Sequence, residues 1–559
     1  DLDKAEKALA DLKAQLSAAN GKLDVLEDLT EKYEELISSW TATTPAIRAF
    51  IQEEINPVYD EMLAAINSGY VDGVSAEDVL NEKMDLVIWA LRSADLTAVR
   101  AELEKNKEEF NDLRLDLTLD AMIEEVKKDG VTYDPDDKPG IDACEDYLAN
   151  HPVLQNNVLQ KRGLKSCDLP ENWNLKHPEI IESIHREYLD AGANIITTNT
   201  FGVNCLKHDN YDELIVSAVN CAKNAVKDYD DGFVAFDIGP LGKFLEPIGD
   251  LPFETAVEVF AKNIRVAQRC GVDLVIIETF TDCYETKAAV LAAKENSDLP
   301  IFVTNVYDEN GKMLTGASIE AMVAMLEGLG VAALGTNCSL GPDKMINIIE
   351  RFSKCSSLPI IANPNAGLPV MVNGKTTYTL NARDFASSVL KLAESGANIL
   401  GGCCGTEPDY IKELVDATRS IPIRNRDDKN LSVVTSYSKA VNIGESPILI
   451  GERINPTGKP KLKEALKKGD IEYILEQGLT QSDAGAHILD VNVGMNEINQ
   501  KEMMKKIVYE IQSVSDIPLQ IDAEDPEVIE TALRMYNGKA MINSVNGKEE
   551  SMSEIFPIV

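Results

Sequence analysis

The chain has 559 residues and a formal net charge of −39, and 44% of its residues are hydrophobic. Its length exceeds the roughly 250 to 300 residues at which single cores stop growing, so we expect two to four domains. The acidic excess argues against a nucleic-acid partner, because phosphate backbones are bound by patches of Lys and Arg. The sequence has no run of about 18 apolar residues and begins with charged residues, which predicts a soluble protein without a signal peptide.

Residues 1–140 form an acidic segment that we expect to be helical. They hold 33 Asp and Glu against 15 Lys and Arg. Apolar residues recur every three or four positions from Leu9 to Leu36, which is typical of an amphipathic helix or a coiled coil. The segment contains no motif with recognisable chemistry, so we predict a helical bundle or interaction arm. The turn-rich stretch 133–140 marks the domain boundary.

All ten cysteines lie between Cys144 and Cys404. A chain of this length does not need disulfides for stability, and grouped cysteines in a reducing cytosol indicate metal binding or catalysis. We therefore expect a cytoplasmic protein. Since the chain lacks an initiator Met, we also expect it to be a fragment of a longer protein.

From about residue 190, short apolar runs alternate with helical patterns. The predicted strands are 193–197, 233–237, 274–278, 301–305, 332–336, 359–362 and 398–401. This alternation is typical of a parallel sheet covered by helices. Seven such units are one short of a closed (β/α)₈ barrel, so we assign residues 141–425 to a TIM-type barrel and expect an eighth strand upstream.

A second series of the same kind follows a polar connection at 424–430. Its predicted strands are 448–455, 488–494, 518–522 and 541–544. Four such strands correspond to the N-terminal half of a second (β/α)₈ barrel, at 440–559, and half a barrel leaves open strand edges. The predicted fold class is therefore α/β, preceded by an all-α segment.

Three thiols stand at the ends of predicted strands in the first series. Cys338 follows one strand, and Cys403 and Cys404 follow another. Barrel enzymes build their sites at the carboxyl ends of strands, and a catalytic zinc typically has three protein ligands and one open position. We therefore predict a zinc site on these cysteines, where a substrate thiol could bind and be deprotonated.

The other seven cysteines lack this grouping, and a buried cysteine is usually a small core hydrophobe. They are Cys144, Cys167, Cys205, Cys221, Cys270, Cys283 and Cys355. None of the five histidines falls at a strand end of the first series. We therefore predict no histidine ligand.

Polar residues at other strand ends suggest binding sites for small molecules. Asp237 and Glu278 could hold a substrate ammonium group, although strand-end carboxylates also cap helices or bind backbone amides. In the second series, a set of polar side chains could surround a polar heterocycle or act as helix caps. That set is Glu452, Asp490, Asn492, Asp522 and Asn543.

Residues 161–422 resemble the homocysteine-binding barrel of the cobalamin-dependent methionine synthase family. The motifs are Pro170-Glu171-Asn172-Trp173-Asn174-Leu175, Thr198-Asn199-Thr200-Phe201-Gly202, Asp237-Ile238-Gly239-Pro240, Glu278-Thr279-Phe280-Thr281-Asp282, Asn337-Cys338-Ser339-Leu340-Gly341-Pro342, Pro364-Asn365-Ala366-Gly367 and Gly401-Gly402-Cys403-Cys404-Gly405-Thr406. Residues 446–559 resemble the start of the methyltetrahydrofolate-binding barrel of that family. The motifs there are Gly451-Glu452-Arg453-Ile454-Asn455-Pro456-Thr457-Gly458, Asp490-Val491-Asn492 and Ile542-Asn543-Ser544.

The resemblance implies methyl transfer to a zinc-bound homocysteine thiolate, which gives methionine. It implies methylcobalamin, recharged from methyltetrahydrofolate, as the donor, and the cobalamin domain of a longer enzyme as a partner. Asn199 and Asn365 stand in the quoted motifs and join Asp237 and Glu278 as substrate-binding candidates. The resemblance also implies that Glu452, Asp522 and Asn543 contact the pterin ring, with Asp490 and Asn492 near it.

Two alternatives stay open. The family begins its first barrel with an Asp-Gly-Ala-Met-Gly-Thr loop, but residues 151–157, just ahead of Leu159, lack that motif. The chain could therefore be an impaired or chimeric fragment with a helical interaction segment. It could also be a cobalamin-independent homocysteine S-methyltransferase, although such stand-alone enzymes lack a following pterin barrel.

Overall fold

The computed structural model describes residues 158–164, 169–372, 375–422, 425–444 and 446–559. The predicted helical segment at 1–140 lies outside these residues, as does any strand upstream of Val158. The described strands form a seven-stranded sheet, a four-stranded sheet and two two-stranded hairpins. Among the described helices, none combines the length and apolar character needed to cross a membrane.

The larger sheet confirms the first predicted series. Its strands are β1 (Ile195–Thr197), β2 (Phe233–Ile238), β3 (Leu274–Phe280), β4 (Ile301–Asn305), β5 (Ala333–Asn337), β6 (Ile360–Asn363) and β9 (Ile399–Leu400). They lie side by side in this order, and every neighbouring pair is parallel. The predicted bounds differ from the observed ones by at most two residues. The α/β, TIM-type fold class is therefore confirmed for this region.

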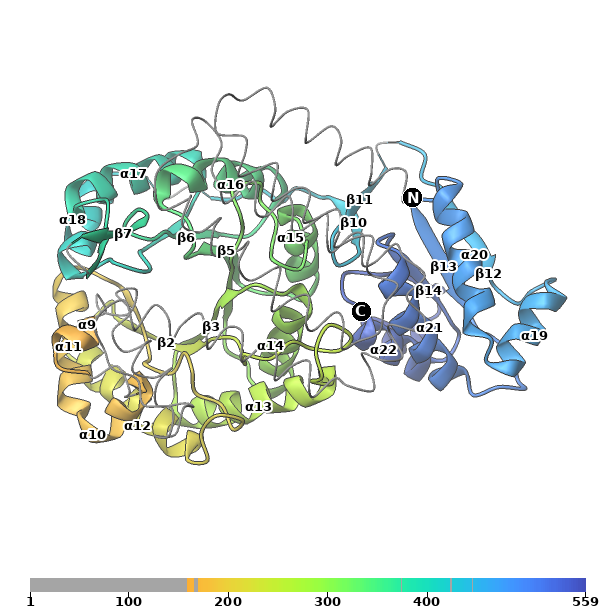
Figure 1. Cartoon of the computed structure of the whole chain (residues 1–559), viewed down its shortest axis with the longest axis horizontal. Coiled ribbons are helices and arrows are strands. Elements are labelled where there is room, and N and C mark those ends of the chain that lie inside the picture. Colours follow the sequence, from red (N-terminus) through yellow and green to blue (C-terminus); the bar gives the residue numbers. More distant parts are fainter. Residues whose placement is uncertain (1–157, 165–168, 373–374, 423–424, 445) are drawn as a thin grey trace, which may run out of the picture. The chain divides into compact units, whose positions relative to one another are not determined.

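Helices connect successive strands and cover the outer face of the curled sheet (Figure 1). They are α11 (Pro178–Asp190), α12 (Tyr211–Val226), α13 (Phe253–Cys270), α14 (Cys283–Asn296), α15 (Ile319–Gly328), α16 (Pro342–Cys355), α17 (Ala382–Ser395) and α18 (Pro408–Thr418). Local signals set several of their ends. The Asp282 side chain caps α14 by accepting a hydrogen bond from the Tyr284 N–H, and Gly271 ends α13 with a left-handed φ of 72°.

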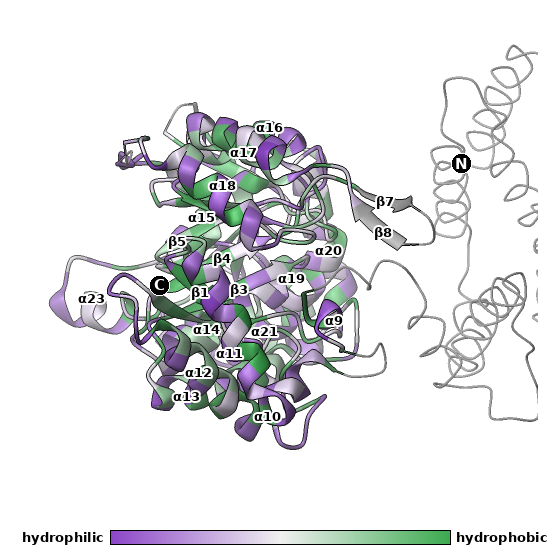
Figure 2. Ribbon diagram, turned by 90° about the vertical axis from the view of Figure 1, so that its left-hand side faces the viewer, coloured by the Kyte–Doolittle hydropathy of each residue, from purple (hydrophilic) through white to green (hydrophobic). Residues whose placement is uncertain are grey.

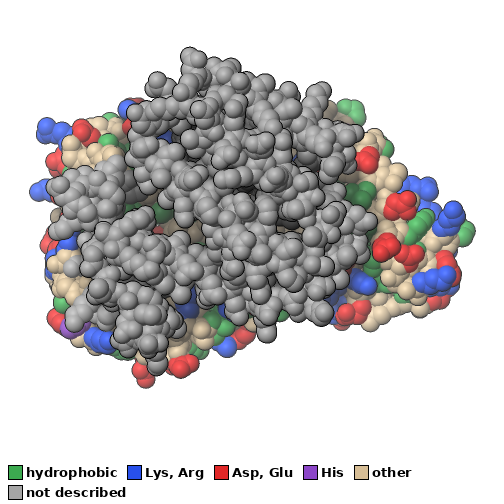
Figure 3. Space-filling model, viewed as in Figure 1, with side chains coloured by type: hydrophobic (Ala, Val, Ile, Leu, Met, Phe, Trp, Pro, Cys, Tyr) green, Lys and Arg blue, Asp and Glu red, His purple; other side chains and the backbone are tan. Residues whose placement is uncertain are grey.

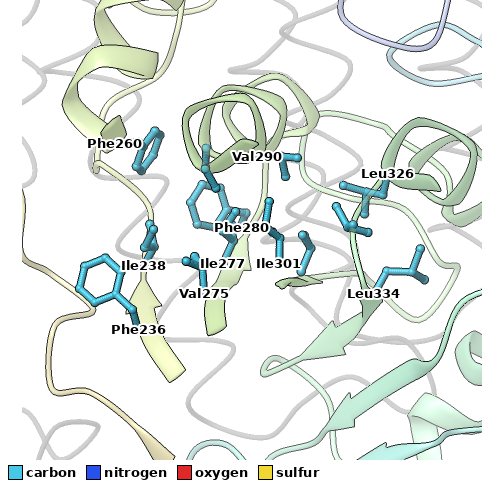
Figure 4. Close-up of a cluster of buried hydrophobic side chains, with 14 of the residues drawn as sticks. Phe236, Ile238, Phe260, Val275, Ile277, Phe280, Val290, Ile301, Leu326 and Leu334 are labelled. Carbon is cyan, nitrogen blue, oxygen red and sulfur yellow. The ribbon is translucent and has the colours of Figure 1, made fainter. Parts of the chain in front are cut away.

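The main core lies between the strands and these helices. Figure 4 shows Phe236, Ile277 and Leu334 from three strands against Phe260 of α13 and Val290 of α14. The helices alternate green and purple in Figure 2, as expected for amphipathic helices that bury one face. A smaller cluster around Ala235, Leu274 and Ile276 faces the inside of the sheet. Apolar side chains therefore lie on both faces of the strands, and on the inner face Ile276 and Phe302 also line a cavity.

The described sheet is curled but not closed, because β1 and β9 are its two edges. Upstream of β1, the described residues form α9 (Val158–Lys161), a short 3₁₀ helix (Pro170–Asn172) and α10 (Trp173–Lys176). The expected eighth strand stays a prediction outside the described residues. A cavity of about 870 Å³ reaches this gap, where Ile181, His185, Ile399 and Val415 line it.

The smaller sheet confirms the second predicted series. Its parallel strands are β12 (Ile450–Ile454), β13 (Ile488–Asn492), β14 (Leu519–Asp522) and β15 (Met541–Asn543). The accompanying helices are α19 (Pro460–Lys468), α20 (Ile471–Asp483), α21 (Gln500–Val514), α22 (Pro526–Met535) and α23 (Glu549–Ile555). This is the arrangement expected for half of a second barrel.

Two antiparallel hairpins were missing from the predicted elements. One consists of β7 (Pro369–Val372) and β8 (Lys375–Tyr378), and the other of β10 (Ser432–Thr435) and β11 (Ala440–Ile443). The second hairpin follows the polar connection at 424–430, in residues for which no element was predicted. On the described surface visible in Figure 3, acidic and basic side chains are interspersed.

Candidate metal and substrate site

The three predicted zinc ligands lie together at the carboxyl edge of the larger sheet. Cys338 follows β5, and Cys403 and Cys404 follow β9. Their sulfur atoms all lie within 4.8 Å of one another, and the Sγ atoms of Cys338 and Cys404 are 3.8 Å apart. A tetrahedral zinc with Zn–S bonds of about 2.3 Å places its sulfur ligands about 3.8 Å apart. The donor set therefore fits zinc in both chemistry and spacing.

The loop after β6 holds both thiol segments through backbone hydrogen bonds. Cys338 N–H donates to the Asn363 carbonyl over 3.1 Å, and Cys403 N–H donates to the Pro364 carbonyl over 2.8 Å. Cys404 N–H donates to the side-chain Oδ1 of Asn365 over 3.1 Å. Asn365, a predicted substrate-binding residue, thus also orients the thiol loop. These contacts fix the sulfur positions before any ligand binds.

Hydrogen bonds within the triad lower the pKa of one thiol and raise the pKa values of the other two. Hydrogen bonds from Cys403 and Cys404 lower the pKa of the Cys338 thiol to about 3. The same bond to Cys338 raises the pKa of Cys404 to about 11, and the pKa of Cys403 also rises. These hydrogen bonds therefore favour the thiolate form of Cys338 over those of Cys403 and Cys404. Metal binding would displace the remaining protons, as ligation by thiolates requires.

Tyr378, at the end of β8, is a neighbour of the thiols that the sequence analysis missed. Burial raises the pKa of its hydroxyl, and the nearby charge and hydrogen bond of Cys404 raise it further. A Cβ placed on Gly405 would lie 2.2 Å from the Tyr378 ring, and Gly405 has a φ of +80°. The ring therefore packs directly on the thiol loop. An apolar run at 368–372 followed by Asn373-Gly374 marks the hairpin in the sequence, but no motif links Tyr378 to the thiols.

Asp237 and Glu278 lie at the ends of neighbouring strands and line the same cavity as Cys403. Asp237 is 5% exposed, and its Oδ1 atom has no hydrogen-bond partner among the described residues. Burial raises the pKa of Asp237, and the charge of Glu278 adds to this effect. Burial, with a contribution from Cys338, raises the pKa of Glu278 to about 7. Among the described residues no Lys or Arg pairs with either carboxylate, so an ammonium group would stabilise this site.

Asn199 also lines the cavity, but its amide nitrogen binds the protein itself. It donates to the Pro170 carbonyl over 2.8 Å and to the Asn174 side chain over 3.0 Å. Nearby, the buried carboxylate of Glu171 accepts a hydrogen bond of 2.8 Å from Gly202 N–H. Glu171 was not singled out as a site residue, although it stands in a quoted motif. Both side chains fix the loop that follows β1.

The predicted pterin residues gather at the carboxyl edge of the smaller sheet. Asn492, Asp522 and Asn543 are register partners on three adjacent strands, so they form one row. Burial raises the pKa of Asp490 to about 6, and its Oδ1 accepts a hydrogen bond from Gln520. This row offers donors and acceptors in the pattern that a polar ring requires.

Two of the predicted pterin residues already have partners inside the protein. The Glu452 carboxylate pairs with the Lys459 ammonium at 2.8 and 3.0 Å. Asn492 Oδ1 accepts a hydrogen bond of 2.8 Å from Gly494 N–H. These two side chains therefore do not act as helix caps in the structure. Asn492 binds its own loop, and Glu452 forms an ion pair.

Comparison with known proteins finds a family match for each of the two regions that carry these candidate sites. Residues 150–418 match the family described as Homocysteine S-methyltransferase, and residues 451–559 match the family described as Pterin binding enzyme. The chain thus carries a homocysteine S-methyltransferase domain followed by a pterin-binding domain. The resemblance noted from the motifs is confirmed at this level.

Curated relatives are similar over most of the chain. The methionine synthase of Mycobacterium leprae (strain TN) is 31% identical over 408 residues, which are 69% of this chain and 34% of that protein. The methionine synthase of Mycobacterium tuberculosis (strain ATCC 25618 / H37Rv) is 30% identical over 403 residues, with the same two shares. The chain thus spans about a third of the length of the curated relatives it matches.

A solved structure is also similar. It is the metallated form of the homocysteine methyltransferase MmuM from Escherichia coli, which is 22% identical, with a TM-score of 0.41. The match covers 47% of this chain and 92% of that chain.

Proposed function

We propose that the chain transfers a methyl group to the sulfur of homocysteine and so forms methionine. The observation that carries this proposal is a thiol triad whose member Cys403 lines the same cavity as Asp237 and Glu278, two carboxylates that have no Lys or Arg partner among the described residues. A thiol and an ammonium group on one small substrate would satisfy both features. The match to homocysteine S-methyltransferases supports homocysteine as that substrate.

Each part of the site has a distinct role in the proposed reaction. Zinc on Cys338, Cys403 and Cys404 would supply the Lewis acidity that keeps a bound thiol deprotonated at neutral pH. Asp237 and Glu278 would hold the ammonium group, with Asn199 and Asn365 close to the substrate. The substrate thiol loses its proton to solvent, and the new S–C bond forms as the bond between donor and methyl group breaks.

The pterin-binding match supports a folate-derived methyl group. We propose that methylcobalamin is the donor and is recharged from methyltetrahydrofolate, which Glu452, Asp490, Asn492, Asp522 and Asn543 would bind. A cobalamin domain of a longer enzyme would then be the partner. A cobalamin-independent donor would leave the second domain without a role. Under this proposal the domains are the acidic segment at 1–140, which lies outside the described residues, a homocysteine barrel at 141–425 and a partial pterin barrel at 440–559, in a cytoplasmic protein.

Zinc stoichiometry tests the central step. We expect about one zinc per chain of 559 residues, no zinc in Cys338→Ala, and wild-type zinc content in Cys205→Ala, whose thiol lies away from the triad. Homocysteine should bind the zinc-loaded protein and release a proton. A purified chain without stoichiometric zinc would contradict the enzyme proposal and favour an impaired fragment.

A further inference from the structure

Asn337 is the last residue of β5, and both polar atoms of its side chain contact residues of the candidate site. Its side chain is fully buried. Its Oδ1 accepts a hydrogen bond of 3.0 Å from Thr279 N–H, and its Nδ2 donates one of 2.7 Å to Thr279 Oγ1. The same Nδ2 lies 3.9 Å from the Sγ of Cys403, within hydrogen-bond range for sulfur. Since only Oδ1 can accept from a backbone N–H, the amide has one orientation, and its second donor faces the thiol.

Thr279 needs these bonds because its backbone is strained. It has a φ of +65°, a region that β-branched residues rarely occupy because it strains the backbone. The register between β3 and β4 shifts between Ile277 and Phe280, so Glu278 and Thr279 form the irregular step. This step determines where the Glu278 carboxylate lies in the cavity. A contact that holds Thr279 therefore also positions Glu278.

We propose that Asn337 is a positioning residue that couples the metal site to the substrate-ammonium site. One side chain holds the left-handed turn that places Glu278 and donates a hydrogen bond to the Cys403 sulfur. The inference rests on the proposed function for the identity of the metal and the substrate. An N–H···S bond withdraws charge from a thiolate, so Asn337 also tunes the sulfur toward a bound metal.

Two variants separate the two contacts of Asn337. In Asn337→Asp, a carboxylate can still accept hydrogen bonds from Thr279 N–H and Oγ1–H, but it has no N–H for the sulfur. In Asn337→Ala, both contacts are lost. Adding Thr279→Gly to Asn337→Ala removes the strain, because glycine adopts positive φ freely. Asn305→Ala is the matched control, since Asn305 is an equally buried amide at the end of β4 that donates to Thr286 Oγ1.

Cobalt(II) serves as the metal probe in the full chain. We expect the sulfur-to-cobalt charge-transfer band to move to lower energy in both Asn337 variants, with metal affinity about 10-fold or more weaker. Homocysteine binding should weaken about 10-fold in Asn337→Ala and recover in the double variant, whose band stays shifted. Asn305→Ala should keep the wild-type band and affinity.

The other possible outcomes contradict either the Asn337 proposal or the proposed function. A wild-type band in Asn337→Asp would overturn the role toward the sulfur. Homocysteine affinity that Thr279→Gly does not restore would overturn the role toward Glu278, and equal losses in Asn305→Ala would reduce Asn337 to a packing residue. If the unaltered chain shows no charge-transfer band, the proposed function fails, and the Asn337 proposal fails with it.

Discussion

In the thiol triad, both the residue types and the spacing of their sulfur atoms are those expected of a zinc site. Two of its members are adjacent in sequence, yet the 3.8 Å spacing joins Cys338 to Cys404, 66 positions away. That spacing matches tetrahedral zinc coordination. The position of each cysteine after a strand could be read from the sequence. The spacing of the sulfur atoms depends on the loop after β6, whose carbonyls and Asn365 side chain bind both segments.

At the same scale, we predict that Glu278 selects substrates by their ammonium group. Glu278→Gln should weaken homocysteine binding to the zinc-loaded protein about 10-fold or more, because a hydrogen bond to a charged group contributes about 1.5 to 3 kcal/mol. Binding of a simple alkanethiol, which has no ammonium group, should not change. Calorimetric titration with both ligands measures this. Equal weakening of both ligands would instead indicate damage to the metal site.

At the scale of elements, the βα alternation was predicted in detail, and the hairpins were missed. The strands β1 to β6 end near their predicted positions because buried parallel strands give continuous apolar runs that stop at polar residues. The β7–β8 hairpin, which supplies Tyr378 to the thiol loop, does carry a signal, because an apolar run at 368–372 is followed by Asn373-Gly374, a typical hairpin turn. The sequence does not indicate on which loop this hairpin packs.

Helix α14 provides a pH prediction at this scale. Glu285, in its first turn, is 5% exposed and accepts a 2.8 Å hydrogen bond from Leu241 N–H. Burial raises the pKa of its carboxyl from 4.5 to about 7. Between those pH values the folded state keeps a proton that the unfolded state releases, so the stability contribution falls as pH rises through this window.

Glu285→Gln should therefore flatten the fall in unfolding free energy between about pH 4.5 and 7, by up to about 3 kcal/mol. Urea unfolding at several pH values measures the slope. Glu413→Gln, at an exposed position on α18, is the control and should leave the slope unchanged. An unaltered slope in Glu285→Gln would show that Glu285 is not the group responsible.

At the scale of the whole molecule, contacts between α14 and α22 join the two parallel sheets. The Lys287 ammonium donates to the carbonyls of Leu533 and Tyr536 near the end of α22, over 2.6 and 2.5 Å. Arg534 binds both carboxylate oxygens of Glu254 and also pairs with Glu295. Lys287 is 6% exposed, so its hydrogen bonds satisfy carbonyls that water cannot easily reach.

We predict that Lys287→Met loosens the smaller sheet without affecting the thiol site. It removes the Lys287 donor from both carbonyls. The Leu533 carbonyl keeps the Tyr536 N–H, whereas the Tyr536 carbonyl has no other donor among the described residues, which costs about 1 to 3 kcal/mol. Hydrogen exchange in α22 should speed up accordingly, while zinc content stays at the wild-type level. Lys501→Met removes an exposed pair with Glu527 and should change exchange little. Equal exchange rates in both variants would argue against a role for Lys287 between the sheets.

The sequence by itself determined the α/β class, both strand series, the order of the two domains and the three thiols. These follow from local periodicity and from the rule that parallel strands place their carboxyl ends at one edge. Tertiary structure alone decided the sulfur spacing, the Asn337–Thr279 contact, the place of Tyr378 and the contacts of Lys287. The Asn337 and Lys287 contacts join residues 58 and 246 positions apart, and no local pattern encodes such distances. Among the described residues, the gap between the edge strands β1 and β9 likewise appears only when the strands are paired.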